Sequence, residues 1–206
     1  MTEHYFTARP RTASRPEETA ETLRGRAYVF LTDAGVFSKG RVDKGTRLLI
    51  ERLPLPAYGD VLDLGCGYGP IGLVIAAESP DARVLMIDVN QRAVELARAN
   101  LARNGVRNAE AVAGDGFDAA GARRFSLIVS NPPIRAGKRV VYAWVEEAHR
   151  RLLPGGRLVM VARTSQGAKS LARKMEEVFG AVRELGKGGG YRVLEAVRRE
   201  AHEGEA

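Results

Sequence analysis

The feature that most constrains the fold is an alternation, from Tyr58 to Val197, of short apolar runs with longer segments whose apolar residues recur at helical spacing. Runs such as ARVLMIDV are nearly all apolar, which is typical of strands buried on both faces of a sheet. Segments such as QRAVELARANLARNG have the periodicity of helices that cover such a sheet. The alternation predicts an α/β fold, a doubly wound Rossmann-like parallel sheet with helices on both faces.

The expected elements follow this pattern along the chain. Strands are predicted at 60–65, 82–89, 109–115, 124–130, 157–163, 181–185 and 191–197. Helices are predicted at 43–53, 70–79, 91–105, 140–153 and 168–179. The last two strands are separated by the glycine-rich GKGGG, which indicates a closing antiparallel hairpin. Residues 1–25 are polar, contain proline and lack periodicity, so we expect a flexible arm there and a single domain over 26–206.

Ligands of doubly wound sheets bind beyond the carboxyl ends of the strands. The first predicted strand ends in DLGCGYG, where glycines allow positive φ and close approach of the backbone to a ligand. The following helix begins near Pro70 and offers free N–H groups to an anionic group. A dinucleotide fingerprint requires Gly or Ala where Pro70 stands, so the turn fits a pyrophosphate clamp poorly.

Acidic residues lie at the ends of the next two predicted strands. Asp88 lies about 20 residues beyond the glycine turn, which is the spacing at which a carboxylate reaches a ribose diol. Asp115, in GDGF, can accept a hydrogen bond from an exocyclic amine of adenine, and Phe117 can lie against the ring. Together with the turn, these residues predict a site for an adenosine-containing cofactor.

The fourth predicted strand ends in SNPPIR. Pro132 and Pro133 exclude a helix interior and a central strand, so they hold the chain extended directly after Asn131. A rigid amide and two exposed carbonyls therefore lie beside the predicted cofactor site.

These residues resemble the class I S-adenosylmethionine-dependent methyltransferases, over about 61–197 of the chain. The resemblance implies a seven-stranded sheet whose last strand, 191–197, is inserted antiparallel. It implies S-adenosyl-L-methionine as cofactor, with Asp63 near the methionine amino group and the glycine-turn backbone against the methionine. The cofactor-binding residues implied are Asp63, Gly65, Cys66, Gly67, Asp88, Val89, Asp115, Gly116, Phe117 and Asn131.

The segment SNPPIR resembles the [ND]-P-P-[YFW] signature of amine and amide methyltransferases, and the catalytic residues implied are Asn131, Pro132, Pro133 and Ile134. In this family the Asn131 oxygen and the Pro132 carbonyl accept hydrogen bonds from an amine whose lone pair is delocalised. Positioning and preorganised acceptors then provide the rate enhancement. Ile134 stands where the signature has an aromatic residue, so ring stacking on the substrate is expected from Phe37 or Tyr142.

The segment GVFSKGRVDKGTRLL, residues 35–49, resembles the region before the catalytic core of small-subunit ribosomal RNA guanine-N2 methyltransferases, in their short single-domain form. The matching residues are Val36, Phe37, Ser38, Asp43, Gly45 and Thr46. Residues 26–57 then form a substrate-side extension and 58–198 the catalytic core. The substrate-binding residues implied are Phe37, Lys39, Arg41, Lys44, Arg135, Lys138 and Arg139, mostly as phosphate contacts.

Composition agrees with an RNA partner. The chain of 206 residues has 32 Lys and Arg against 25 Asp and Glu, a net charge of +7, which favours a polyanion. No apolar run approaches the ~18 residues needed to span a bilayer, and the first residues lack a signal-peptide core, so we expect a cytoplasmic protein with no membrane partner. One cysteine and three scattered histidines predict no metal site.

Two alternatives remain open at this point. One keeps the enzyme class but changes the acceptor to a glutamine side chain in a protein or to adenine N6 in nucleic acid. The usual aromatic residue at position 134 in those groups argues mildly against them. The other is an inactive cofactor-binding domain that chaperones RNA, although the complete motifs from Asp63 to Asn131 argue against loss of activity.

Overall fold

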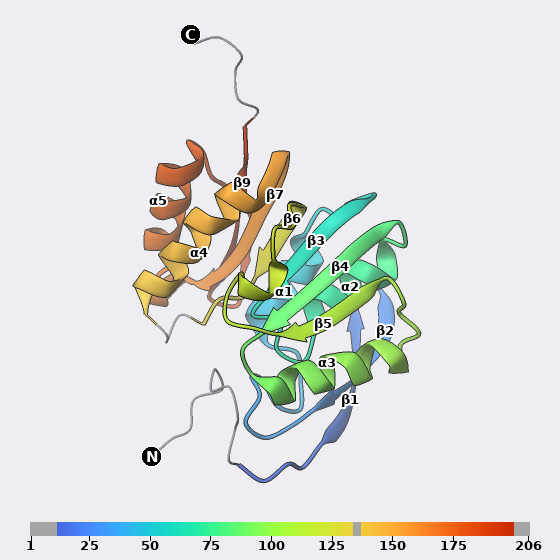
Figure 1. Cartoon of the computed structure of the whole chain (residues 1–206). Helices are drawn as coiled ribbons and strands as arrows, with labels where there is room; N and C mark the ends of the chain where they lie inside the picture. The colour runs from blue at the N-terminus through green and yellow to red at the C-terminus, as the bar shows by residue number, and fades with distance from the viewer. Residues whose placement is uncertain (1–11, 134–136, 200–206) are drawn as a thin grey trace.

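A seven-stranded sheet forms the centre of the computed structural model, which describes residues 12–133 and 137–199 (Figure 1). The spatial order of the strands is β5-β4-β3-β6-β7-β9-β8. All neighbours are parallel except β9, which is antiparallel to both β7 and β8. The strands are β3 (Gly59–Leu64), β4 (Ala82–Asp88), β5 (Ala109–Ala113), β6 (Phe125–Ser130), β7 (Leu152–Arg163), β8 (Arg183–Gly188) and β9 (Tyr191–Val197). The predicted fold class is confirmed, including the antiparallel insertion of the last strand.

Helices cover both faces of this sheet and divide its core into two apolar clusters. The buried residues of α1 (Lys44–Arg52), α2 (Pro70–Glu78) and α3 (Gln91–Arg103) belong to one cluster. Those of α4 (Lys138–Arg151) and α5 (Ala168–Phe179) belong to the other. Adjacent residues of β3 alternate between the clusters, with Val61 in the first and Leu62 in the second, as side chains of a strand must. Short 3-10 helices, η1 (Asp118–Ala120) and η3 (Thr164–Gln166), follow β5 and β7.

The N-terminal part of the chain forms a β-hairpin that packs against α1 and α3, where the sequence predicted a flexible arm. Glu17–Leu23 forms β1, which pairs antiparallel with β2 (Arg26–Thr32). The expectation of a loose arm over 1–25 is therefore wrong for 17–23, because β1 is held by pairing with an apolar neighbour rather than by its own hydrophobicity. Residues 12–16 are described as well, and there the Asp33 carboxylate accepts hydrogen bonds from Ser14 Oγ and Arg15 N, both at 2.6 Å.

Two asparagines, Asn100 of α3 and Asn104 at its C-cap, bind the backbone of β2 as a neighbouring strand would. Asn100 Oδ1 accepts from Leu31 N at 2.6 Å and its Nδ2 donates to Leu31 O at 3.0 Å. Asn104 repeats this pair of hydrogen bonds with Val29 N and O. The side-chain amides therefore satisfy the backbone groups that β1 does not reach, and they fix the hairpin against the helix that follows β4.

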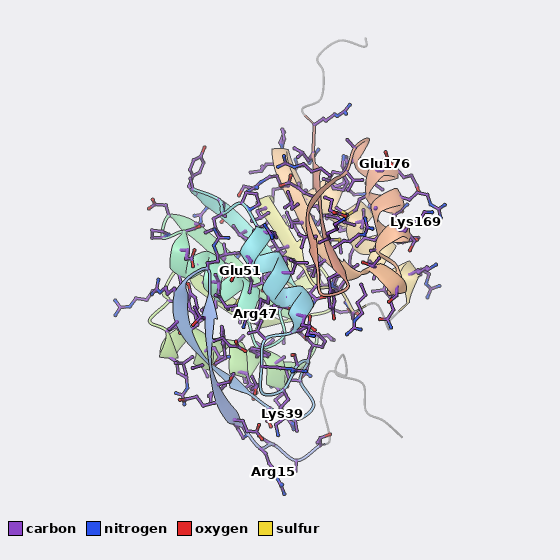
Figure 2. The ribbon with its side chains drawn as sticks, turned by 180° about the vertical axis from the view of Figure 1, so that it is seen from behind. Arg15, Lys39, Arg47, Glu51, Lys169 and Glu176 are labelled. Atoms are coloured by element: carbon purple, nitrogen blue, oxygen red, sulfur yellow. The ribbon has the colours of Figure 1, made fainter. Side chains whose placement is uncertain are left out.

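Helix α1 lies on the face of the sheet seen in Figure 2, where it packs against β7, β8 and β9. Asp43 is its N-cap and its side chain accepts from Gly45 N and Thr46 N, which satisfies two of the free N–H groups of the first turn. None of the helices within the described ranges is long and apolar enough to cross a membrane.

Candidate functional site

A cavity of about 650 Å³ lies at the carboxyl ends of the central strands, where the glycine turn, Asp88 and Asn131 meet. This volume is within the usual range for small-molecule sites. The structure brings most of the predicted site residues to its wall. The predicted residues that line it are Phe37, Gly65, Cys66, Gly67, Asp88, Val89, Asp115, Gly116, Asn131, Pro132 and Pro133.

The glycine turn after β3 has the backbone conformation that its sequence requires. Gly65, Gly67 and Gly69 have φ values of 72°, 57° and 91°, in the left-handed region that favours glycine. Gly65 N and Cys66 N both donate to Ile87 O, which ties the turn to the end of β4. A Cβ placed on Gly67 would meet no atom within 4 Å, so the backbone of the turn is open to a ligand there.

Asp88 holds the same turn from the end of β4. Its Oδ2 accepts from Gly67 N and its Oδ1 accepts from Asn90 N, each at 2.8 Å. Burial raises the pKa of the Asp88 carboxyl, and these two hydrogen bonds oppose that shift. Each carboxylate oxygen can accept a further hydrogen bond, so a diol that enters the cavity has an acceptor on the wall.

Asp63 lies behind the turn and does not line the cavity. It is fully buried, its Oδ2 accepts from Gly72 N at 2.8 Å, and its Oδ1 has no hydrogen-bond partner among the residues that the structure describes. Burial raises the pKa of Asp63 to about 7, and the nearby Asp88 carboxylate adds to the shift. The unpartnered oxygen is compatible with a nearby ammonium group, which is the environment that the family resemblance implies for this residue.

The Asp63 carboxyl predicts a dependence of stability on pH. Its pKa is raised in the folded protein from 3.8 to about 7, so the folded state binds this proton more tightly than the unfolded state. The corresponding stability is present at low pH and is lost as the pH rises through about 7. The free energy of unfolding of the Asp63→Asn variant should therefore rise relative to that of the parent between about pH 4 and about pH 7, and the difference should stay level at higher pH. Urea unfolding of both proteins at each pH measures this, and a difference that does not change with pH would exclude an ionisable Asp63 as the source.

Phe117, which was predicted to contact the adenine ring, does not lie at the cavity. Phe117 is buried in the apolar cluster beneath α4 and does not line the cavity. Trp144 of α4 lines it instead. A Cβ on Gly65 would lie 3.4 Å from Trp144 Cη2, and one on Gly116 would lie 3.3 Å from Trp144 Nε1. The indole therefore spans the two glycine turns, and we assign the contact with an adenine ring to Trp144 as a proposal.

Asn131 stands directly after β6 with its amide held in one orientation. Its Nδ2 donates to Thr46 Oγ1 at 2.9 Å and to Asp43 Oδ2 at 3.3 Å. No residue in the described ranges donates to its Oδ1, which leaves this oxygen as an acceptor beside the cavity. Pro132 and Pro133 also line the cavity, whereas the predicted Ile134 and Arg135 lie outside the described residues.

The predicted cationic residues that the structure describes lie outside the cavity wall. Lys39, Arg41, Lys44, Lys138 and Arg139 are exposed and are not among the lining residues. Lys39 pairs with Glu17 at 2.7 Å and projects from the loop after β2 (Figure 2). Their role as phosphate contacts stays a prediction. Tyr142 does not line the cavity either; its hydroxyl faces Ser170 O and its ring faces Lys174.

Several lining residues were not predicted from the sequence as part of the site. Tyr191 begins β9, Arg163 ends β7 and Gln166 ends η3, so all three reach the same end of the sheet as the glycine turn. The sequence offered only a weak signal for Tyr191 and Arg163, namely an aromatic and a basic residue at the ends of predicted strands. Residues of both types are also common at ordinary surface positions. Across residues 12–133 and 137–199, no group of three or more His, Cys, Asp or Glu side chains is arranged to hold a metal ion.

The sequence matches the protein family described as methyltransferase small domain over residues 27–195. It is 43% identical over 198 residues to the uncharacterized protein YbxB of Bacillus subtilis (strain 168), which covers 95% of this chain and 98% of that protein. It is 39% identical over 168 residues to ribosomal RNA small subunit methyltransferase C of Pseudomonas aeruginosa (strain UCBPP-PA14), which covers 80% of this chain and 49% of that protein. The chain thus spans about half the length of the relatives that carry the latter name.

A solved structure agrees with these matches. A 16S rRNA N2 methyltransferase (RsmC) of T. thermophilus, in complex with AdoMet and guanosine, has a TM-score of 0.80 and 33% sequence identity to this chain. The match covers 92% of this chain and 52% of that one.

Proposed function

This chain belongs to the methyltransferase small domain family, which is a family of S-adenosylmethionine-dependent enzymes, and we propose that it methylates the exocyclic N2 of a guanine in ribosomal RNA. The family, enzyme class and cofactor predicted from the sequence are confirmed. One observation carries the choice of an amine acceptor: Asn131 is held with its Nδ2 on Asp43 and Thr46, so that its Oδ1 is free to accept.

The cavity fits the cofactor on three observations. The glycine turn is open at Gly67, the Asp88 carboxylate can accept from a ribose diol, and Trp144 provides an aromatic wall. When bound, S-adenosylmethionine supplies an electrophilic methyl group on a positively charged sulfur. We assign the adenosine to the side formed by Asp88, Asp115 and Trp144, and the methionine to the glycine turn.

The substrate amine has a lone pair that is delocalised into the guanine ring, which makes it a weak nucleophile. We propose that Asn131 Oδ1 and the Pro132 carbonyl accept hydrogen bonds from its two N–H groups. These acceptors orient the nitrogen and stabilise the positive charge that develops on it as the new bond forms. The same acceptors favour a nitrogen with two N–H groups over a ring nitrogen without them.

The guanine and the RNA are supported by the relatives. One is named as a ribosomal RNA small subunit methyltransferase, and a similar structure contains guanosine. A guanine in folded RNA has to leave its stack to reach a cavity of this kind. We propose that the exposed cations Lys39, Arg41, Lys44, Lys138 and Arg139 contact the phosphates on either side of this guanine.

The experiment incubates the purified protein with S-adenosylmethionine labelled in the methyl group and with small ribosomal subunits or protein-free ribosomal RNA that lack the modification. Digestion to nucleosides and mass spectrometry identify the product. The proposal requires label in N2-methylguanosine. Label in N6-methyladenosine or in a glutamine side chain would support the other acceptors, and cofactor binding without any transfer would support an inactive RNA-binding domain.

A charge reversal at the start of α4 tests the proposed RNA surface. Lys138→Glu with Arg139→Glu should weaken RNA binding at low salt and reduce the slope of log affinity against log salt by about 1 for each lost phosphate contact. Cofactor affinity should not change, since neither side chain lines the cavity. The matched control is Arg107→Glu with Arg124→Glu, which are exposed and precede β5 and β6 at the opposite end of the sheet. Equal losses in both double variants would exclude a localised RNA surface at α4.

A further inference from the structure

We propose that Asp43, Thr46 and Tyr191 are positioning residues that hold the Asn131 amide with its oxygen toward the substrate amine. This inference rests on the proposed function, because it explains how Asn131 is prepared for an amine acceptor. The three residues come from the start of α1 and the start of β9, and Asn131 comes from the end of β6. Segments far apart in the sequence therefore converge on one side chain.

Asp43 is at the centre of this arrangement. Its Oδ2 accepts from Gly45 N at 2.8 Å and from Thr46 N at 3.2 Å, and it also accepts from Asn131 Nδ2 at 3.3 Å. As the N-cap of α1 it is fixed by the helix backbone, so its position does not depend on a ligand. The carboxylate that caps α1 therefore also holds Asn131.

The chemistry of a carboxylate decides which way the amide points. An ionised carboxylate only accepts hydrogen bonds, and the amide of asparagine has one accepting and one donating end. Turning the Asn131 amide around would place its oxygen 3.3 Å from Asp43 Oδ2 and would remove both hydrogen bonds of Nδ2. The observed orientation is thus favoured by charge as well as by hydrogen bonding, and it leaves Oδ1 available to the substrate.

Thr46 supplies the second and shorter of the two contacts. Its Oγ1 accepts from Asn131 Nδ2 at 2.9 Å, and the residue is buried in the first turn of α1. Asp43 selects the orientation of the amide, because a threonine hydroxyl can donate as well as accept, and the short contact with Thr46 limits the movement of the amide once it is oriented.

Tyr191 fixes Asp43 from the other side. The tyrosine hydroxyl donates to Asp43 Oδ1 at 3.3 Å and accepts from Arg163 Nε at 2.8 Å. The guanidinium of Arg163 also lies over the tyrosine ring, 5.0 Å from its centroid. The ring packs so closely on the first turn of α1 that a Cβ on Gly45 would lie 2.6 Å from Tyr191 Cε1. This contact explains the glycine at position 45 and couples β9 to the cap of α1.

The test uses Thr46→Val and Tyr191→Phe, which remove one oxygen each and nearly preserve shape. Each variant should lower kcat for guanine methylation on the order of 10-fold, through misorientation of Asn131, with little change in KM or cofactor affinity. The matched control is Tyr58→Phe, which removes a tyrosine hydroxyl from an exposed residue directly before β3, at the opposite end of the sheet, and should leave kcat unchanged. Asp43 itself is a poor test residue because its replacement also removes the cap of α1.

A double-mutant cycle separates positioning from a general effect on folding. When Asn131→Ala is already present, adding Thr46→Val should cause no further loss of kcat, because there is no amide left to orient. If the losses multiply, Thr46 acts independently of Asn131 and the proposal is overturned.

A second readout needs no substrate, so it distinguishes failure of this inference from failure of the proposed function. The side-chain NH₂ of Asn131, assigned in the ¹⁵N-labelled protein by its absence in Asn131→Ala, should show slow hydrogen exchange that becomes faster in Thr46→Val and Tyr191→Phe. Unchanged exchange in both would overturn the inference, whatever the substrate. If hydrogen exchange of the Asn131 NH₂ becomes faster in these variants but the protein does not methylate guanine, the positioning role is supported and the proposed guanine acceptor is wrong.

Discussion

The Asn131→Ala variant should lose methyl transfer by about 10²-fold or more while its affinity for S-adenosylmethionine stays nearly intact. The amide oxygen is an acceptor that the substrate amine meets as its charge develops, so its removal raises the barrier without removing a main contact to the cofactor. Single-turnover rates with ribosomal RNA and calorimetric titration with S-adenosylmethionine measure the two effects separately.

The Asn131→Asp variant tests whether position 131 requires an amide rather than any oxygen acceptor. Related signatures allow aspartate at this position, but here a second carboxylate would face Asp43 where an NH₂ group now lies 3.3 Å away. Like charges at this distance repel, so Asn131→Asp should be no more active than Asn131→Ala in this protein. Full activity of either variant would remove the Asn131 amide from the mechanism.

The second large effect is expected at Asp88. The Asp88→Ala variant should weaken S-adenosylmethionine binding on the order of 100-fold, because it removes both an acceptor for the ribose and the side chain that holds the glycine turn through Gly67 N. Calorimetric titration measures the dissociation constant, and thermal unfolding shows whether the variant is folded.

Glu110→Ala is the matched control for this loss of a carboxylate. Glu110 lies on the neighbouring strand β5, is exposed and pairs with Arg123 away from the cavity. Its replacement should leave the dissociation constant unchanged. An affinity for S-adenosylmethionine in Asp88→Ala equal to that of the parent would contradict the assignment of the ribose to the end of β4.

The sheet and its helices were predictable because burial imposes a period on the sequence. β4 is buried over most of its length and reads as a continuous apolar run, and α5 buries Leu171, Met175 and Phe179 on one face. β1 was missed because EETAETL carries almost no apolar signal. Its strand depends on pairing with β2, and β2 depends in turn on Asn100, which lies about 70 residues further along the chain.

The parts of the candidate site that lie in short sequence motifs at the ends of strands could be predicted from the sequence. The glycine turn, Asp88 and Asn131 line one cavity because each follows a parallel strand, and such strands end at the same edge of a sheet. Trp144 was not predicted to line the cavity, because its place there depends on how α4 packs over the two glycine turns. Asp43 and Thr46 lie in the segment that resembles the guanine-N2 methyltransferases, but no local sequence pattern shows that the start of α1 meets the end of β6.

The most direct test of the central claim is a crystal structure of the protein with S-adenosylhomocysteine and guanosine. We predict that Asn131 Oδ1 lies about 3 Å from the exocyclic nitrogen of guanine, with Nδ2 still on Thr46 and the amine turned toward the sulfur. A complex in which the Asn131 oxygen points away from the base, or in which the base binds with its amine remote from the sulfur, would contradict the claim.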